Sequence, residues 1–286
     1  MGQTRQEWID GGQRAVLAGW EIFFRQDGPE DGRAVTLLHG FPTSSHDWAD
    51  TVPGLFAAGH RVTTLDLLGF GASSKPRDHR YRIEEQASIV EALWARLGVT
   101  ATALVAHDYG VTVAQELLAR DPDRIERMVW LNGGLYADLY RPIPIQKLLL
   151  GPLGGVLASM ATERSYRASL RQTLGRKVSK DHLHQMWLST SANGGKHVQR
   201  ALMRYIEDRR TNAARWQAAN ESYEGPALFV WGPADPISGG HVLPRLRERM
   251  TRAEFAVLDE QPATGHYPHV ENPTAVIEHL VRFLAA

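Results

Sequence analysis

Short apolar stretches alternate with segments of helical periodicity along most of the chain. The stretches are brief, continuous and rich in branched residues, which is typical of strands buried on both faces. They lie at 34–38, 61–65, 103–105, 127–131, 227–231 and 253–258. Apolar residues at helical spacing predict helices at 48–58, 83–97, after Gly110 and at 274–284. The segment 13–26 indicates an antiparallel strand pair at a sheet edge. Together these elements predict an α/β fold with a mostly parallel, doubly wound sheet.

The segment 135–223 interrupts this alternation. It contains no convincing strand, but it has helical periodicity, aromatic residues and many arginines. We therefore expect a helical lid (cap) inserted after the strand that ends at Leu131, with 1–134 and 224–286 forming the core domain. The most apolar segment, 148–161, is interrupted by glycine and proline. It is therefore too short to predict a membrane span.

The segment 101–120 predicts a strand, a sharp turn and a helix, with Asp108 at the apex of the turn. Small residues two positions before and after the apex, Ala106 and Gly110, are typical of a nucleophile elbow. An aspartate before a helix can also be a simple N-cap. As a nucleophile, its carboxylate suits a saturated carbon that bears a leaving group, because the resulting ester can be hydrolysed by an activated water. That chemistry needs a histidine, a second acid and amide donors.

The chain contains candidates for each of these groups. Asp235 and His266 both follow predicted strands, in the turns W-G-P-A-D-P and T-G-H-Y-P-H. Taken singly, each is an ordinary loop residue. The order nucleophile, acid, histidine is that of hydrolases built on parallel sheets, and the carboxyl ends of such strands share one rim. We therefore expect Asp108, Asp235 and His266 to form a catalytic triad.

The loop His39-Gly40-Phe41-Pro42 also follows a predicted strand. It would place the Phe41 amide beside that of Tyr109, and two convergent amides are what an oxyanion requires. His39 and Pro42 are expected to lie against the substrate, and His39 to serve as a hydrogen-bonding residue rather than as a base.

Composition narrows the possible functions. Lys plus Arg and Asp plus Glu are balanced at 32 each, which suggests neither a nucleic-acid partner nor an anionic membrane surface. Cysteine is absent, which excludes disulfides and thiolate ligands and suits a cytoplasmic location. The 12 histidines show no metal-binding motif. Gly69-Phe70-Gly71 lacks the third glycine of a dinucleotide fingerprint. We expect neither a metal nor a cofactor.

These motifs resemble the α/β-hydrolase superfamily, specifically its aspartate-nucleophile branch of epoxide hydrolases and haloalkane dehalogenases. The resemblance spans H-G-F-P at 39–42, D-L-L-G-F-G-A-S at 66–73, H-D-Y-G at 107–110, G-P-A-D at 232–235 and G-H-Y-P-H at 265–269. A narrower similarity, in H-D-Y-G-V-T-V-A-Q-E-L-L and in N-G-G at 132–134, is to the mesoderm-specific transcript proteins.

The resemblance also bears on the leaving group. Dehalogenases of this branch hold the halide with a tryptophan after the nucleophile and an asparagine in the H-G-N-P loop, where this chain has Tyr109 and Phe41. Epoxide hydrolases instead protonate the ring oxygen with lid tyrosines. Tyr205 lies 30 residues before Asp235, as expected for one of them, although Arg204 replaces the usual preceding aromatic residue. Tyr166 is the choice for the second, with Tyr140 and Tyr136 close behind.

The resemblance therefore implies a cofactor-independent epoxide hydrolase. Its partners would be water and a small hydrophobic epoxide, and its product a vicinal diol. A monomer or homodimer is expected, with neither nucleic acid nor a membrane span. Two alternatives stay open at this point: a haloalkane dehalogenase with unusual halide donors, and a weakly catalytic protein that binds a ligand.

Overall fold

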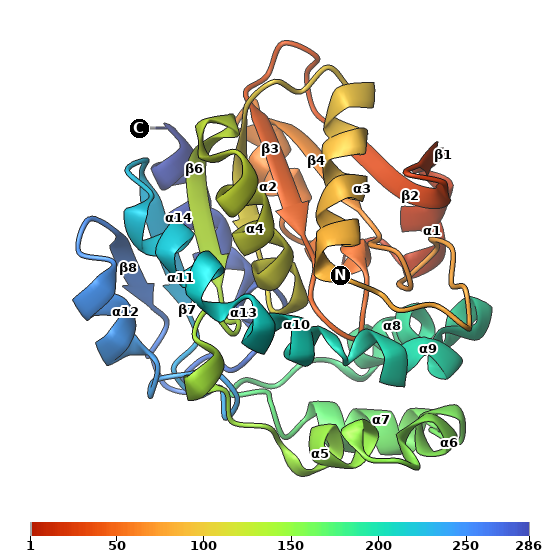
Figure 1. Ribbon diagram of the computed structural model, residues 1–286. Coiled ribbons are helices and arrows are strands. Elements are labelled where there is room, and N and C mark those ends of the chain that lie inside the picture. Colours follow the sequence, from red (N-terminus) through yellow and green to blue (C-terminus); the bar gives the residue numbers. More distant parts are fainter. Residues whose placement is uncertain (1, 286) are drawn as a thin grey trace.

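The computed structural model describes residues 2–285, which form an eight-stranded sheet with helices on both faces (Figure 1). The strand order is β1-β2-β4-β3-β5-β6-β7-β8. β2 pairs antiparallel with β1 and β4, and the other pairs are parallel. The strands are β1 (Gln13–Leu17), β2 (Trp20–Asp27), β3 (Ala34–Leu38), β4 (Arg61–Leu65), β5 (Thr102–Ala106), β6 (Ile125–Leu131), β7 (Ala227–Trp231) and β8 (Glu254–Val257). The predicted doubly wound, mostly parallel sheet is confirmed.

Side chains along each central strand point alternately to the two faces of the sheet. In β7, Phe229 and Trp231 join the apolar cluster under α3 and α4, whereas Leu228 and Val230 join the cluster under α2 and α14. All of β7 is buried. A strand covered on both sides has no polar face, and this is why the sequence shows continuous apolar runs rather than alternation.

Helices of the core cover both faces of this sheet. They are α1 (Arg5–Asp10), α2 (Val52–Ala57), α3 (Ile83–Arg96), α4 (Tyr109–Arg120), α12 (Leu243–Arg249), α13 (Pro268–Glu271) and α14 (Pro273–Ala285), with 3₁₀ turns η1 (Ser45–Trp48) and η2 (Pro122–Arg124). The predicted helix at 48–58 proves shorter, because η1 occupies its expected start and α2 begins only at Val52. The helices α1 and α12 were not predicted.

Between β6 and β7 the described chain is entirely helical or irregular. The helices are α5 (Pro144–Leu150), α6 (Gly154–Ser159), α7 (Glu163–Leu170), α8 (Lys180–Ser191), α9 (Gly195–Leu202), α10 (Tyr205–Thr211) and α11 (Ala213–Ser222), with η3 (Ala137–Leu139) and η4 (Ala192–Gly194). Most of them lie beyond the carboxyl ends of the strands, with α5, α6 and α7 outermost (Figure 1). We keep the name lid for 135–223. No helix within residues 2–285 is long and apolar enough to cross a bilayer.

Candidate active site

Asp108 stands at the apex of a tight turn between β5 and α4. Its backbone has φ 45° and ψ −102°, a conformation that is rare for a non-glycine residue and that costs free energy. The turn requires glycine two residues later, because a Cβ on Gly110 would lie 2.7 Å from the carbonyl oxygen of Leu38. The Asp108 side chain makes no capping hydrogen bond to α4. The side chain is therefore not used as an N-cap, and it lines a cavity instead.

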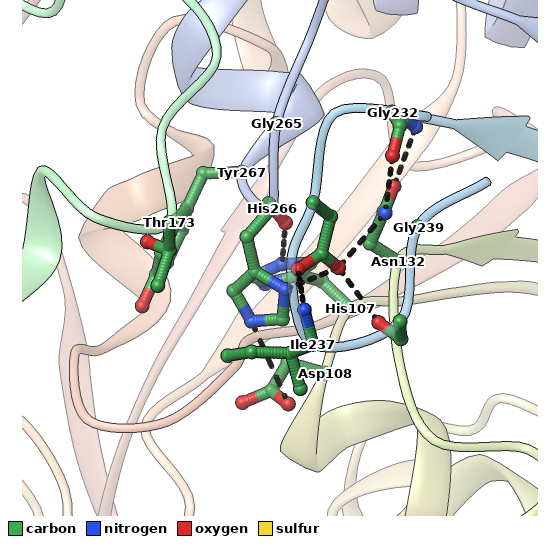
Figure 2. A network of polar contacts seen from close by, with 12 residues as sticks. His107, Asp108, Asn132, Thr173, Gly232, Ile237, Gly239, Gly265, His266 and Tyr267 are labelled. Atoms are coloured by element: carbon green, nitrogen blue, oxygen red, sulfur yellow. Dashed lines mark hydrogen bonds and ion pairs between the residues drawn. The ribbon is translucent and has the colours of Figure 1, made fainter. Parts of the chain in front are cut away.

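The imidazole of His266 lies between two carboxylates. Its Nδ1 is 2.8 Å from Oδ2 of Asp235, and its Nε2 is 3.7 Å from Oδ1 of Asp108. Figure 2 shows the ring above the Asp108 carboxylate. The structure thus brings together the three residues predicted to form a triad, from the ends of β5, β7 and β8. A water molecule between Nε2 and the Asp108 carbonyl carbon would be within reach of both groups.

Asp235 is held by donors from its own turn and from β6. The amide of Ile237 and the hydroxyl of Ser238 each donate at 2.7 Å, and the side-chain amide of Asn132 donates at 3.0 Å. Asn132 also pairs with the backbone of Gly232, accepting at 2.6 Å and donating at 2.8 Å (Figure 2). In the sequence, Asn132 directly follows the predicted strand 127–131, but no pattern indicated that it orients the acid.

Burial and charge compete at this pair. Burial alone would raise the pKa of Asp235 and lower that of His266. The attraction between the two groups and their hydrogen bond outweigh this cost, so the pKa of Asp235 is lowered and that of His266 is raised to about 9. The negative charge of Asp108 adds to the rise for His266. Converting Asp108 to a neutral ester would therefore lower the pKa of His266 and make it a better base for the second step.

Phe41 supplies the predicted amide. Its N–H donates to Oδ2 of Asp108 at 2.9 Å, which places this donor on one carboxylate oxygen and leaves Oδ1 toward His266. Tyr109 is the first residue of α4, where backbone amides lack helical partners. The hydroxyl of Tyr267 donates to the Phe41 carbonyl at 2.9 Å and so fixes this loop. The sequence did not predict that Tyr267 holds the Phe41 loop in place.

His39 and Pro42 have different surroundings. His39 is fully buried, and burial lowers its pKa. One ring nitrogen lies 2.8 Å from the Gly40 carbonyl, and the other accepts from the Leu67 amide at 3.1 Å. His39 is absent from the cavity wall formed by the described residues, so it braces the loop and does not face the cavity. Pro42 does line the cavity.

A buried glutamate connects the histidine loop to the lid. Glu271 accepts from the amides of Gly265 and Tyr267, on either side of His266, and from those of Gly175 and Arg176 in the lid, all at 2.7–3.0 Å. The His266 amide in turn donates to the Thr173 carbonyl at 2.8 Å. The two segments approach so closely that a Cβ on Gly265 would lie 2.3 Å from the Gly175 nitrogen. The position of His266 therefore depends on the lid as well as on the core.

Above Asp108 and His266 lies a cavity of about 370 Å³. Its walls are mostly apolar and come largely from α5 to α8 of the lid, with Phe41, Pro42 and Tyr267 from the core. Such a cavity suits a small apolar molecule, held by a few polar groups near Asp108. Within residues 2–285, no cluster of histidine, aspartate and glutamate could hold a metal ion.

The candidate proton donors are separated by the structure. Tyr166 on α7 lines the cavity, and its hydroxyl accepts a hydrogen bond from the Thr190 hydroxyl at 3.2 Å. Tyr205 is buried under Arg209, whose guanidinium lies 4.8 Å from its ring centre, and against Tyr109 at 4.8 Å. It does not belong to the cavity wall among the described residues.

Tyr136 and Tyr140, the other two tyrosines considered from the sequence, also lie outside that wall. The Tyr136 hydroxyl donates to Glu221 at 3.1 Å. The Tyr140 hydroxyl is buried and has no hydrogen-bond partner within residues 2–285.

Comparison with known proteins agrees with the observed fold. Residues 33–273 match the family model described as the alpha/beta hydrolase fold. The LipZ protein of Mycobacterium tuberculosis is 38% identical over 98% of this chain and 97% of its own length. The human mesoderm-specific transcript homolog protein is 37% identical over 97% of this chain and 87% of its own.

Shorter and more distant matches extend the set. Epoxide hydrolase B of Mycobacterium tuberculosis is 38% identical over 40% of this chain and 33% of its own length. The structure of haloalkane dehalogenase DbeA from Bradyrhizobium elkani superposes with a TM-score of 0.83 over 96% of this chain and 97% of its own, at 22% identity, and this likeness concerns the fold. The chain belongs to the alpha/beta hydrolase fold family, and its homologues include hydrolases.

Proposed function

We propose that the protein is an epoxide hydrolase that converts a hydrophobic epoxide to a vicinal diol without a cofactor. The observation that carries the proposal is the surroundings of Asp108. Its Oδ2 accepts a hydrogen bond from the Phe41 amide, and its Oδ1 lies 3.7 Å from Nε2 of His266. Asp108 and His266 line an apolar cavity together with Tyr166. A carboxylate nucleophile, a base and a phenol above it suit the opening of a strained ring and the hydrolysis of the ester.

In the first step, Oδ1 of Asp108 attacks a ring carbon, the carbon–oxygen bond of the epoxide breaks, and the leaving oxygen takes a proton from a phenol. Tyr166 is our choice of donor because it lines the same cavity as Asp108. Tyr205 is packed between Tyr109 and Arg209, although burial and then the nearby charge of Asp108 raise its pKa, so its phenol is the second candidate. The product of this step is an alkyl ester on Asp108.

In the second step, His266 removes a proton from water, and the resulting hydroxide attacks the carbonyl carbon of the ester. The Phe41 and Tyr109 amides would stabilise the oxyanion, which is worth about 3 kcal/mol per donor in other enzymes. The ester bond then breaks, the leaving alkoxide takes the proton of the newly formed carboxyl group, and the diol departs, which restores Asp108 as a carboxylate. The proton on His266 returns to the phenolate. The sum is epoxide plus water to diol.

The surroundings of the nucleophile give less support to halide release. The Tyr109 side chain is buried against Phe70, with Gln86 donating to its hydroxyl at 3.4 Å, so it does not face the cavity. Phe41 has no side-chain N–H. Trp187 on α8 is the single tryptophan of the cavity wall among the described residues, and its indole N–H could serve a halide, as could the side-chain amides of Gln146 and Gln199 in the same wall.

The test is a His266→Gln variant incubated with styrene oxide and with longer aliphatic epoxides. We expect Asp108 to be alkylated and the ester to persist, seen by mass spectrometry as an added mass on the peptide that contains Asp108. The wild-type protein should form diol and show no persistent adduct. An Asp108→Ala/His266→Gln double variant is the matched control and should gain no mass.

Other outcomes would decide between the alternatives. Bromide release from brominated alkanes, lost in a Trp187→Phe variant, would replace the proposal with a dehalogenase. Ligand binding that is unchanged in Asp108→Ala, with neither turnover nor adduct across the panel, would indicate a binding protein.

A further inference from the structure

Exposed apolar side chains are concentrated on the outer helices of the lid. The described chain exposes eight large apolar side chains, and six of them lie within 148–160 on α5, α6 and the turns beside them. Met160 is 71% exposed and Leu153 66% exposed. We call this set the lid patch: Leu148, Leu150, Leu153, Val156, Leu157 and Met160. Isolated apolar residues on a surface need no explanation, but a cluster of this kind marks an interaction site.

The lid that carries the patch is rich in basic residues, and one of them, Arg200, donates to the Gly151 carbonyl within the patch segment at 3.2 Å. Residues 141–200 contain ten Lys and Arg against two Asp and Glu, although the whole chain is balanced at 32 each. One of the two acids, Glu163, is already paired with Arg167 and His184. Lys147, Arg164, Arg171 and Arg200 are all exposed. The overall neutrality of the chain therefore conceals a lid of strongly positive charge beside a core with a compensating negative charge.

The lid patch is also continuous with the cavity above Asp108. Leu148, Leu157 and Met160 are exposed on their outer side, and all three also line the cavity. In Figure 1 the helices α5 and α6 form the part of the molecule farthest from the sheet, so a flat surface could meet them without touching the core. A surface that met the lid patch would lie at the mouth of the cavity.

We propose that the lid patch docks on the surface of an anionic phospholipid bilayer, and that apolar substrates enter the cavity from that surface. Apolar side chains would enter the acyl boundary, and the basic residues of the lid would meet anionic headgroups, which is how interfacial helices bind membranes. This inference goes beyond the proposed function and does not depend on it, because docking can be measured without turnover.

The charge argues against a second copy of the chain as the occupant. A symmetric dimer through this face would bring the same basic lid against itself, with like charges opposed. A protein partner seated on the lid patch would close the cavity mouth, whereas a bilayer would supply apolar molecules to it.

The experiment is flotation of the full-length protein with vesicles of equal parts phosphatidylcholine and phosphatidylglycerol, compared with vesicles of phosphatidylcholine alone. We expect binding to the mixed vesicles, weaker binding to the neutral ones, and loss of binding in high salt. A Leu153→Ser/Val156→Ser variant should bind roughly tenfold more weakly or worse. Its matched control is Val16→Ser/Phe56→Ser, which removes side chains of similar exposure from the core.

The charge is tested in the same way. An Arg164→Gln/Arg171→Gln variant should lose affinity for the mixed vesicles only, whereas Arg96→Gln/Arg252→Gln, at exposed core positions, should not. Absence of binding to mixed vesicles, or equal losses in lid and core variants, would overturn the proposal. So would a dimer in sedimentation that dissociates in the Leu153→Ser/Val156→Ser variant, because the lid patch would then be a contact between copies.

Discussion

The sheet rim and the lid are built by opposite means. At the rim, Asp108, Asp235 and His266 are buried and are held by hydrogen bonds from the loops that follow several strands. In the lid, the cavity walls are apolar side chains on short helices, and several of them are also exposed. Directional bonds fix atoms for chemistry, whereas apolar contacts determine only size and polarity. The rim therefore specifies the reaction and the lid specifies the molecule that undergoes it.

The largest expected effect comes from the rim. Asp108→Ala should lower turnover by roughly 10⁴-fold or more, since it removes the atom that forms the covalent bond. Thermal unfolding should show only a small loss of stability, because the substitution removes the hydrogen bond from the Phe41 amide but no capping bond, and alanine occupies the same strained backbone position. The measurement is diol formation together with circular dichroism. Residual activity near the wild-type level would remove Asp108 from the mechanism.

The next effect tests whether the lid also contributes chemistry. Tyr166→Phe should slow alkylation of Asp108 by roughly 10²-fold, as expected on losing a general acid, and Tyr205→Phe by only a few-fold. Single-turnover kinetics in the His266→Gln background would measure alkylation alone. Tyr140→Phe is a useful third variant, because its buried hydroxyl is unpartnered among the described residues. A larger loss for Tyr205 than for Tyr166 would contradict the assignment.

The triad should also make stability depend on pH. The pKa of His266 is raised from 6.5 to about 9, so the protonated form is favoured in the folded protein. The stabilisation of the folded protein by the protonated imidazole is complete below pH 6.5 and is lost as the pH rises through 9. The loss should be on the order of 3 kcal/mol or less. Denaturant unfolding measured between pH 6.5 and 9 should show this decrease in the free energy of unfolding for the wild type. The His266→Gln variant should not show the decrease.

The smallest effect should come from the apolar lid wall. Leu149→Ala enlarges the cavity on the lid side and should raise KM by roughly tenfold for a hydrophobic epoxide, with kcat nearly unchanged.

The pattern should reverse for Asn132→Ala, which loosens Asp235 and should reduce kcat more than it changes KM. Steady-state kinetics on both variants would separate the roles of lid and rim.

Much of the fold was predictable because it depends on local patterns. The continuous apolar runs predicted β3, β4 and β7 at their observed bounds, since strands covered on both faces have no polar side. The elbow around Asp108 was predictable for a similar reason, because only small residues fit beside so sharp a turn. The start of α2 was not predictable, since a 3₁₀ turn and a helix share the same short-range pattern.

The sequence by itself determined the sheet, the elbow and the residue types available for chemistry, because strand burial and turn geometry depend on neighbouring residues. Only the tertiary structure decided which partners hold them. Asn132 reaches Asp235 across 103 residues, and Glu271 reaches Gly175 across 96. It also decided that Tyr166 lines the cavity while Tyr205 does not, and that three residues of the lid patch line the same cavity. Such contacts depend on how distant segments pack, and no local spacing encodes them.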